Sequence, residues 1–241
     1  MSAPGRPLVL VGASGLAREV LAVVRQHGAL EVAGVVDDAP ERAGEDVDGV
    51  PVLGTPDALA RRTDVDVLVC VGRGSGRAEL VGRLAALGVG ADRYATVVHP
   101  SAQVPPGCTV GAGSVLLAGV VLTAAVRVGA HVVLMPHVTL THDDRVGDFA
   151  TLAAGVSLGG GVVVGERAYL GMNAAVRERV RVGAGATLGM GAALLTDLPD
   201  GETWAGVPAR PLLGGAVAAR PVADAAAAHR PAGRDERPVA V

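Results

Sequence analysis

The stretch VGAHVVLMPHVTLTHDDRVG, residues 128–147, decides the fold of this chain. Within it an aliphatic residue recurs at every sixth position, and the row continues on both sides without a break. No helix repeats every six residues, and three hexads give an 18-residue period marked by a recurring Val-Gly pair. The row consists of Val104, Val110, Leu116, Leu122, Val128, Leu134, Leu140, Val146, Leu152, Leu158, Val164, Leu170, Val176, Val182, Leu188 and Leu194.

This periodicity predicts a parallel β-helix of triangular section. Each turn has three short strands, each strand points one aliphatic residue inward, and Gly or small residues occupy the corners, where the backbone must bend. The composition agrees, because the chain has no Ile and only four Phe, Tyr and Trp residues, as a narrow interior requires. A disordered glycine-rich tract would show no such phase.

The preceding segment has an α/β pattern. The strand-like PLVLVGASG leads through a glycine turn into the helical LAREVLAVVRQHG, and EVAGVVDDAP is a second strand ending in two carboxylates. A short helix, a strong strand at Val67 to Val71 and a helix from GRAELVGRLAALG follow. The alternation predicts a Rossmann-like α/β domain over residues 1–94, with a small parallel sheet covered by helices. Residues 214–241, rich in Ala, Arg and Pro, are expected to be mostly disordered.

Charge and composition exclude several classes of protein. The net charge of −3 provides no basic field for a nucleic-acid backbone, and the few aromatics form no stacking platform. No apolar run reaches membrane-spanning length and the N-terminus lacks a signal-peptide core, so a cytoplasmic protein is expected. Cys70 and Cys108 are expected to be small buried residues rather than a disulfide.

Several motifs resemble one family. HPSAQV, THDDRVGDF, LGMNAAVRERVRVGAGATLGMGA and GVPARPL are similar to the hexapeptide-repeat sugar acyltransferases, in the branch of sialic-acid O-acetyltransferases and bacillosamine N-acetyltransferases. VGASGLAREV, VVDD and VGRGSGRAEL resemble the nucleotide-sugar-binding domain of the same branch. The resemblance covers residues 7–213. It implies a left-handed β-helix over 95–213, a homotrimer, acetyl-CoA in the groove between neighbouring helices, and a nucleotide sugar bound partly by the front domain.

The resemblance places His142 on the catalytic histidine of the family. An imidazole, with an ordinary pKa near neutrality, can remove a proton from an amine or hydroxyl that attacks a thioester and return it to the thiolate. Asp143 or Asp144, or a neighbour across the trimer interface, could orient the ring. The alternative for His142 is a solvated residue at a corner of the helix.

The resemblance also implies binding residues in the repeats. Residues expected to line the CoA channel or to lie near the CoA nucleotide are Gly160, Gly171, Met172, Gly189, Met190, Ala209 and Arg210. In the acceptor shell Met135, Thr141 and Thr151 stand where members of the family have Asn, Glu and His. Because these residues differ, the acceptor group can be an amine or a hydroxyl, and the acceptor need not be a sugar. A non-catalytic scaffold that binds a nucleotide sugar is a further alternative.

The glycine turn of the front domain suggests a nucleotide site. Amides at a helix N-terminus bind phosphate, and an acidic pair about twenty residues on can hold a ribose or uracil group. The expected residues are Gly12, Ser14, Gly15, Asp37, Asp38 and Gly72. The alternative is an ordinary tight turn between strand and helix.

A metal site on His131, His137 and His142 is an alternative, because a related β-helix family, the γ-type carbonic anhydrases, binds zinc by histidines of neighbouring coils. Eighteen residues from each, one coil away, stand only Gly, Ala or Phe, whose side chains cannot coordinate. No metal is therefore expected.

Overall fold

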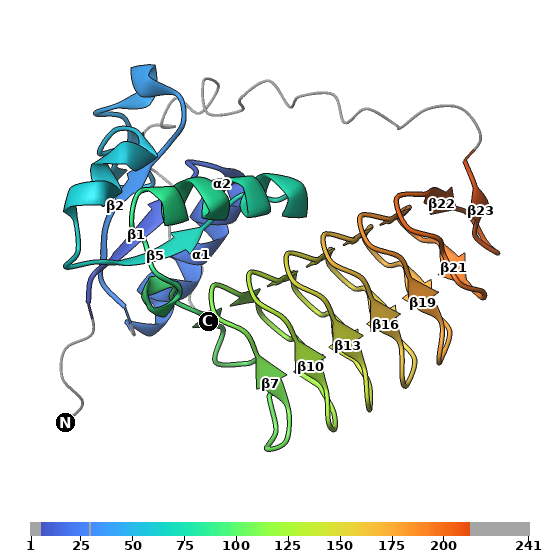
Figure 1. Ribbon diagram of the computed structural model, residues 1–241. Coiled ribbons are helices and arrows are strands. Elements are labelled where there is room, and N and C mark those ends of the chain that lie inside the picture. The colour runs from blue at the N-terminus through green and yellow to red at the C-terminus, as the bar shows by residue number, and fades with distance from the viewer. Residues whose placement is uncertain (1–5, 29, 213–241) are drawn as a thin grey trace, which may run out of the picture.

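The computed structural model describes residues 6–28 and 30–212, and the predicted disordered tail lies outside them. An α/β domain lies beside the first coils of a parallel β-solenoid of about six turns (Figure 1). This confirms the two parts expected from the sequence. None of the helices in the described part of the chain is long and apolar enough to cross a bilayer.

The front domain is a three-stranded parallel sheet in the order β2-β1-β5, with β1 at Leu8–Val11, β2 at Val32–Val36 and β5 at Asp66–Val69. Both faces of the sheet are apolar and each is covered by one helix. α1, Gly15–His27, packs on one face, and α2, Gly74–Ala86, on the other. The remaining elements are η1 Pro40–Arg42, β3 Asp46–Val47, β4 Val50–Pro51, η2 Pro56–Arg61 and η3 Ala91–Arg93.

The solenoid has three faces built almost entirely of two-residue strands. Face 1 contains β7 Thr109–Val110, β10 Arg127–Val128, β13 Arg145–Val146, β16 Val163–Val164 and β19 Arg181–Val182. Face 2 contains β6 Val97–Val98, β8 Val115–Leu116, β11 Val133–Leu134, β14 Thr151–Leu152, β17 Tyr169–Leu170, β20 Thr187–Leu188, β22 Thr203–Ala205 and β23 Arg210–Pro211. Face 3 contains β9 Val121–Leu122, β12 Thr139–Leu140, β15 Ser157–Leu158, β18 Ala175–Val176 and β21 Ala193–Leu194.

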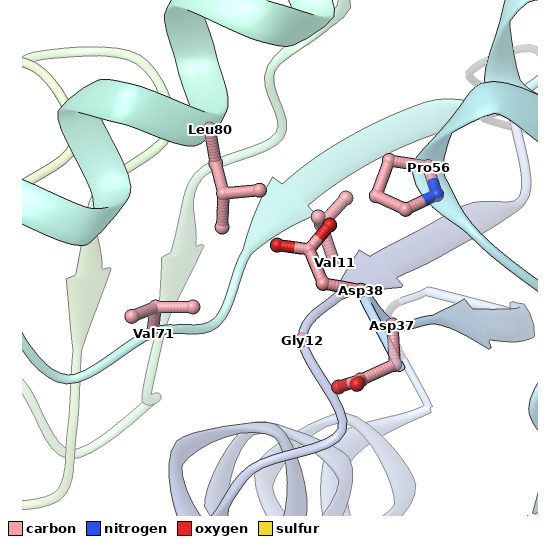
Figure 2. A pocket seen from close by; sticks show the side chains of 7 residues that line it. All are labelled: Val11, Gly12, Asp37, Asp38, Pro56, Val71 and Leu80. Carbon is pink, nitrogen blue, oxygen red and sulfur yellow. The ribbon is translucent and has the colours of Figure 1, made fainter. Parts of the chain in front are cut away.

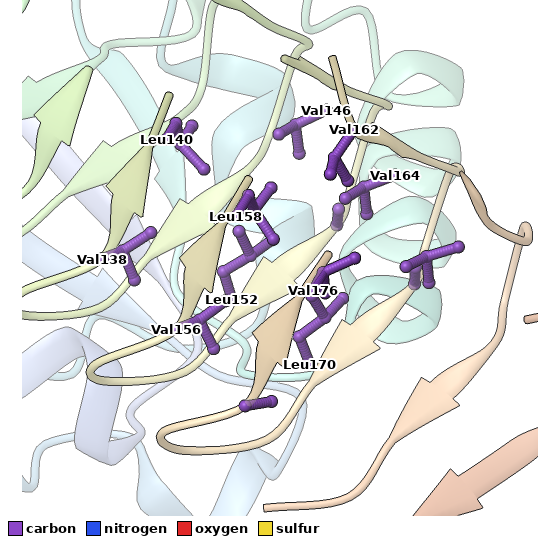
Figure 3. Close-up of a cluster of buried hydrophobic side chains, with 14 of the residues drawn as sticks. Val138, Leu140, Val146, Leu152, Val156, Leu158, Val162, Val164, Leu170 and Val176 are labelled. Atoms are coloured by element: carbon purple, nitrogen blue, oxygen red, sulfur yellow. The ribbon is translucent and has the colours of Figure 1, made fainter. Parts of the chain in front are cut away.

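The core of the solenoid is the six-residue row. From β7 to β21 the second residue of each strand points inward and stacks on its counterparts in neighbouring coils, as the side chains in Figure 3 show. The first member of the predicted row is an exception. Val104 is 38% exposed, because it starts the row and no earlier member covers it.

Three stacks of four-residue corners join the faces. Corner A joins face 1 to face 2 at residues 111–114, 129–132, 147–150, 165–168 and 183–186. Corner B joins face 2 to face 3 at 117–120, 135–138, 153–156, 171–174 and 189–192. Corner C joins face 3 to face 1 at 123–126, 141–144, 159–162, 177–180 and 195–198.

The expected role of glycine at the corners is only partly correct. The third residue of each corner from 113 to 191 has positive φ, yet glycine occupies six of these fourteen positions, and His, Asp, Phe, Arg, Asn or Ala the others. The glycines of the recurring Val-Gly pair serve close approach between coils instead. A Cβ on Gly165, for example, would lie 2.5 Å from the backbone nitrogen of Ala184.

Candidate active site

His142 lies on corner C, in the turn 141–144 between β12 and β13. Its Nδ1 is 2.9 Å from Oδ2 of Asp143, and both side chains are 69% exposed. A carboxylate can only accept, so the proton of a neutral ring lies on Nδ1 and the lone pair on Nε2. The pair therefore presents an unprotonated nitrogen to solvent, as a general base requires.

Gly160, in the next coil of corner C, lies directly beneath the imidazole. A Cβ built on Gly160 would lie 2.3 Å from Nε2 of His142. The carbonyl of His142 also accepts from the backbone N–H of Gly161 at 2.8 Å. Gly160, which the sequence suggested for the CoA channel, is thus a neighbour of the candidate base.

The second aspartate has a different position. Asp144 is fully buried and accepts backbone N–H bonds from Thr141 at 2.7 Å and Val162 at 2.8 Å. Burial raises the pKa of Asp144 to about 6. Asp143, and not Asp144, is therefore the residue that contacts the histidine ring.

Four of the residues expected in the CoA channel gather on corner B, whereas Gly160 lies on corner C. Met172 and Met190 are 49% and 72% exposed and occupy the same place in successive coils. Gly171 and Gly189 precede them and allow close approach, because a Cβ on Gly171 would lie 2.5 Å from the backbone nitrogen of Met190. Corners B and C form the two opposite edges of face 3. Within one chain, these methionines and His142 therefore lie at different edges of that face.

The closing segment ends the solenoid. Ala209 is buried, packs in the solenoid core and donates its N–H to the carbonyl of Ala193 at 2.8 Å. Arg210 begins β23, which pairs antiparallel with β22, and is exposed. Only Arg210 of these two offers its side chain to a ligand.

The front domain has a small pocket at the carboxyl ends of β1 and β2 (Figure 2). Gly12, Asp37 and Asp38 line it together with Val11, Pro56, Val71 and Leu80. Asp37 accepts from the backbone N–H of Ala13 at 2.7 Å, which fixes one carboxylate against the glycine turn. The carboxyl end of a parallel sheet is where such domains bind ligands.

Comparisons with known proteins agree with this geometry. Residues 7–84 match the PglD N-terminal domain, and residues 161–195 match the hexapeptide repeat of succinyl-transferases. PerB from Caulobacter crescentus, solved in complex with CoA and GDP-perosamine, is 32% identical, with 86% of this chain and 97% of that chain covered and a TM-score of 0.78. The chain belongs to the hexapeptide-repeat sugar acyltransferase family.

Two further solved structures are similar to this sugar acyltransferase. The acetyltransferase domain of PglB from Neisseria gonorrhoeae is 32% identical, with 86% of this chain and 100% of that chain covered and a TM-score of 0.76. WeeI from Acinetobacter baumannii is 27% identical, with 86% and 99% covered and a TM-score of 0.75. A comparison with curated proteins found no match.

Other residues expected in the nucleotide site of the acyltransferase do not line the pocket. Ser14 caps α1, accepting from the N–H of Leu16 at 3.1 Å, and donates its hydroxyl to the carbonyl of Cys70 at 2.6 Å. Gly15 is the first residue of α1. The Ser14 side chain is used in capping, and the N–H groups of Gly12, Ala13, Leu16 and Ala17 donate within the protein. Among the described residues, the N–H groups of Ser14 and Gly15 are the ones left at this turn to meet a phosphate.

Gly72 and Thr151, both expected near substrate, meet at the junction of the two domains. The hydroxyl of Thr151, which is buried, donates to the carbonyl of Gly72 at 2.9 Å. Met135 is half-buried and packs against the core shared by α1 and the first coils. Thr141 donates its hydroxyl to the carbonyl of Leu158 at 3.0 Å. The contacts of these four residues are with other parts of the protein, so they support the structure around the site and do not line an open surface.

Arg77 was missed in the sequence, although it lies in the quoted VGRGSGRAEL. Its guanidinium is fully buried, and burial lowers its pKa to about 10. It donates to front-domain carbonyls of Val71 and Gly72 at 2.8 and 3.0 Å. From the same side chain it donates to solenoid groups, namely the carbonyls of His131, Phe149 and Ala150 and the hydroxyl of Thr151. No local pattern predicts these partners, because they lie 54 to 74 residues away.

The three histidines considered for zinc stand on three different corners. His131 lies on corner A, His137 on corner B and His142 on corner C. In the described residues 6–28 and 30–212, no group of three or more His, Cys, Asp or Glu could hold a metal ion.

Proposed function

We propose that this protein transfers an acyl group, acetyl in the first instance, from CoA to the amine of a sugar linked to a nucleotide. The observation that carries the proposal is the His142–Asp143 pair, whose free Nε2 faces an open corner beside Gly160. The family supports the substrates, because PerB was solved with CoA and GDP-perosamine and this chain covers 97% of it.

In the proposed reaction the neutral amine of the acceptor attacks the thioester carbonyl. Nε2 of His142 takes the proton that the amine must lose and later gives it to the departing thiolate. Asp143 holds the ring through Nδ1 and stabilises the imidazolium in the interval, since their atoms are 2.9 Å apart. The reaction then ends with an amide and a free CoA thiol.

We infer that the site is completed by a second copy in a homotrimer of left-handed β-helices. Corner C carries His142, while corner B carries Met172 and Met190, and the two bound face 3. The outward residues of face 3 are uncharged and mostly small, namely Val121, Thr139, Ser157, Ala175 and Ala193. Face 1 has arginines at three of the five equivalent places. Packing of face 3 around an axis would bring corner C of one copy against corner B of the next.

The front-domain pocket is the proposed nucleotide site. Gly12, Asp37 and Asp38 line it at the end of the parallel sheet, where ligands of such domains bind. The carboxylates can accept hydrogen bonds from ribose hydroxyls or base N–H groups, and the N–H groups of Ser14 and Gly15 at the start of α1 can donate to phosphate.

The test is CoA thiol release from acetyl-CoA with a panel that pairs free amino sugars with their nucleotide-linked forms. Release should require the linked form. His142→Ala should lower the rate by about 10² to 10⁴-fold, whereas His27→Ala, an exposed histidine of α1, should not. Unchanged turnover of His142→Ala would refute the role of the base.

The panel also separates the other functions that the sequence left open. If a hydroxyl acceptor or a non-sugar amine supports thiol release and no nucleotide-linked amino sugar does, the proposed acceptor is wrong and that compound class takes its place. Absence of acetyl-CoA binding, measured by calorimetry, would favour the non-catalytic scaffold.

A further inference from the structure

The turn that carries His142 has a different hydrogen-bond pattern from the rest of corner C. In the turns that begin at residues 123, 159 and 177 the first N–H donates to a carbonyl of the neighbouring coil, as in Thr123 to Leu140 at 3.1 Å and Arg177 to Leu194 at 2.9 Å. In the turn of His142 the N–H of Thr141 donates to Oδ2 of Asp144 at 2.7 Å. The carbonyl of Leu158, which that N–H would otherwise reach, accepts from the hydroxyl of Thr141 instead.

Asp144 also joins this turn to the next one. Its Oδ1 accepts from the N–H of Val162 at 2.8 Å. In the following coil the equivalent N–H, that of Val180, donates to the carbonyl three residues back at 3.4 Å. One carboxylate therefore ties the turn of His142 to the turn that contains Gly160, on which the imidazole rests.

The position of Asp144 would suit an aliphatic residue better. It belongs to a second six-residue row of buried side chains: Val120, Val126, Val132, Val138, Asp144, Ala150, Val156, Val162, Ala168, Ala174, Val180, Ala186, Ala192 and Leu198. Ser114 precedes Val120 in the same row and is also buried and polar, so Asp144 is the one charged member of this row. Burial of a carboxylate is costly, and its replacement by a well-packed apolar residue is often neutral or stabilising. Stability alone gives no reason for an aspartate here.

We propose that Asp144 is a positioning residue for His142, which it serves by fixing the turn 141–144 against the turn 159–162. The inference rests on the proposed role of His142 as the base. Without the carboxylate, the N–H groups of Thr141 and Val162 lose their acceptor and the imidazole loses its fixed place over Gly160. Misplacement by about 1 Å can cost 10²-fold in rate.

The test compares Asp144→Val and Asp144→Asn with the wild type in the thiol-release assay. Asp144→Val, which restores the aliphatic row, should lower kcat by about 10²-fold. The KM for acetyl-CoA should stay unchanged and the Tm should be equal or higher. Asp144→Asn keeps one acceptor oxygen and should retain an intermediate kcat. Gly160→Ala, which pushes the ring directly, should give the same loss of kcat.

Ser114→Ala is the matched control. Ser114 is also buried in the interior and accepts from the N–H of Val132, one coil on, at 3.0 Å, but at corner A. It should keep the wild-type kcat. Wild-type kcat in Asp144→Val, or a loss of kcat that accompanies a lower Tm, would overturn the inference. Because His142→Ala is measured in the same assay, full activity of that variant would instead reject the proposed function.

Discussion

At the residue scale, the candidate site separates two carboxylates by environment. Asp143 has positive φ, is exposed and contacts the ring of His142. Its neighbour Asp144 points inward and bonds only backbone N–H groups. Adjacent residues of one turn therefore have different tasks, because their side chains leave the corner on opposite sides.

The environment of Asp144 predicts a dependence of stability on pH. Burial raises its pKa to about 6 in the folded protein, from an ordinary value of 3.8. The folded state then holds the proton more tightly than the unfolded state between about pH 4 and 6, so this contribution to stability is present at low pH and is lost as pH rises through that window. The Tm of Asp144→Val minus that of wild type should increase from pH 4 to 6 and then level off. A difference independent of pH would contradict this.

Family motifs and strand ends have local signatures, so the sequence singles out His142, Asp37 and Asp38. The structure places the two aspartates in one pocket, and the role of His142 stays a prediction. The burial of Asp144 could have been found too, since it interrupts a second six-residue row of Val and Ala. The contact between Gly160 and the imidazole could not, because it depends on how two coils stack.

At the element scale, α1 and α2 attach the front domain to the solenoid in different ways. α1 shares an apolar core with Val115, Leu117 and Val133 of the first coils. α2 uses Arg77 and a close approach at Gly74, where a Cβ would lie 2.0 Å from the carbonyl oxygen of Phe149. The fold of each part was predictable from periodicity, but this junction was not. A single polar side chain that bonds distant carbonyls produces no repeating pattern in the sequence.

Replacement of Arg77 should loosen the junction. Arg77→Lys keeps the charge but loses the planar fork that reaches six acceptors, and several buried carbonyls are left without a donor. The expected cost is about 3 kcal/mol or more, seen as a lower Tm by scanning calorimetry. The KM for the nucleotide sugar should rise, because Val71, which lines the pocket, is one of the six partners. Arg73→Lys, an exposed arginine beside α2, is the control, and an equal Tm in both variants would count against the junction.

At the scale of the whole molecule, the three faces of the solenoid have different tasks. Face 2 receives the front domain through its first coils. Face 1 is charged, with Arg127, Arg145 and Arg181 in register along it. Face 3 has no charge among its outward strand residues and lies between the corner of His142 and the corner of the two methionines. The arginines set face 1 aside and the front domain covers the first coils of face 2, so face 3 is the surface that best suits packing against other copies.

A charge placed on face 3 should separate the proposed trimer and abolish activity together. Ala175→Arg would bring guanidinium groups of several copies toward one axis, where unpaired charges without water cost several kcal/mol each. Light scattering should then report the mass of one chain instead of three, with thiol release lost because corner C no longer meets a neighbour's corner B. Val163→Arg adds the same charge to face 1, beside Arg145 and Arg181, and should keep mass and activity. A single chain that remains fully active in Ala175→Arg would show that one solenoid holds the complete site.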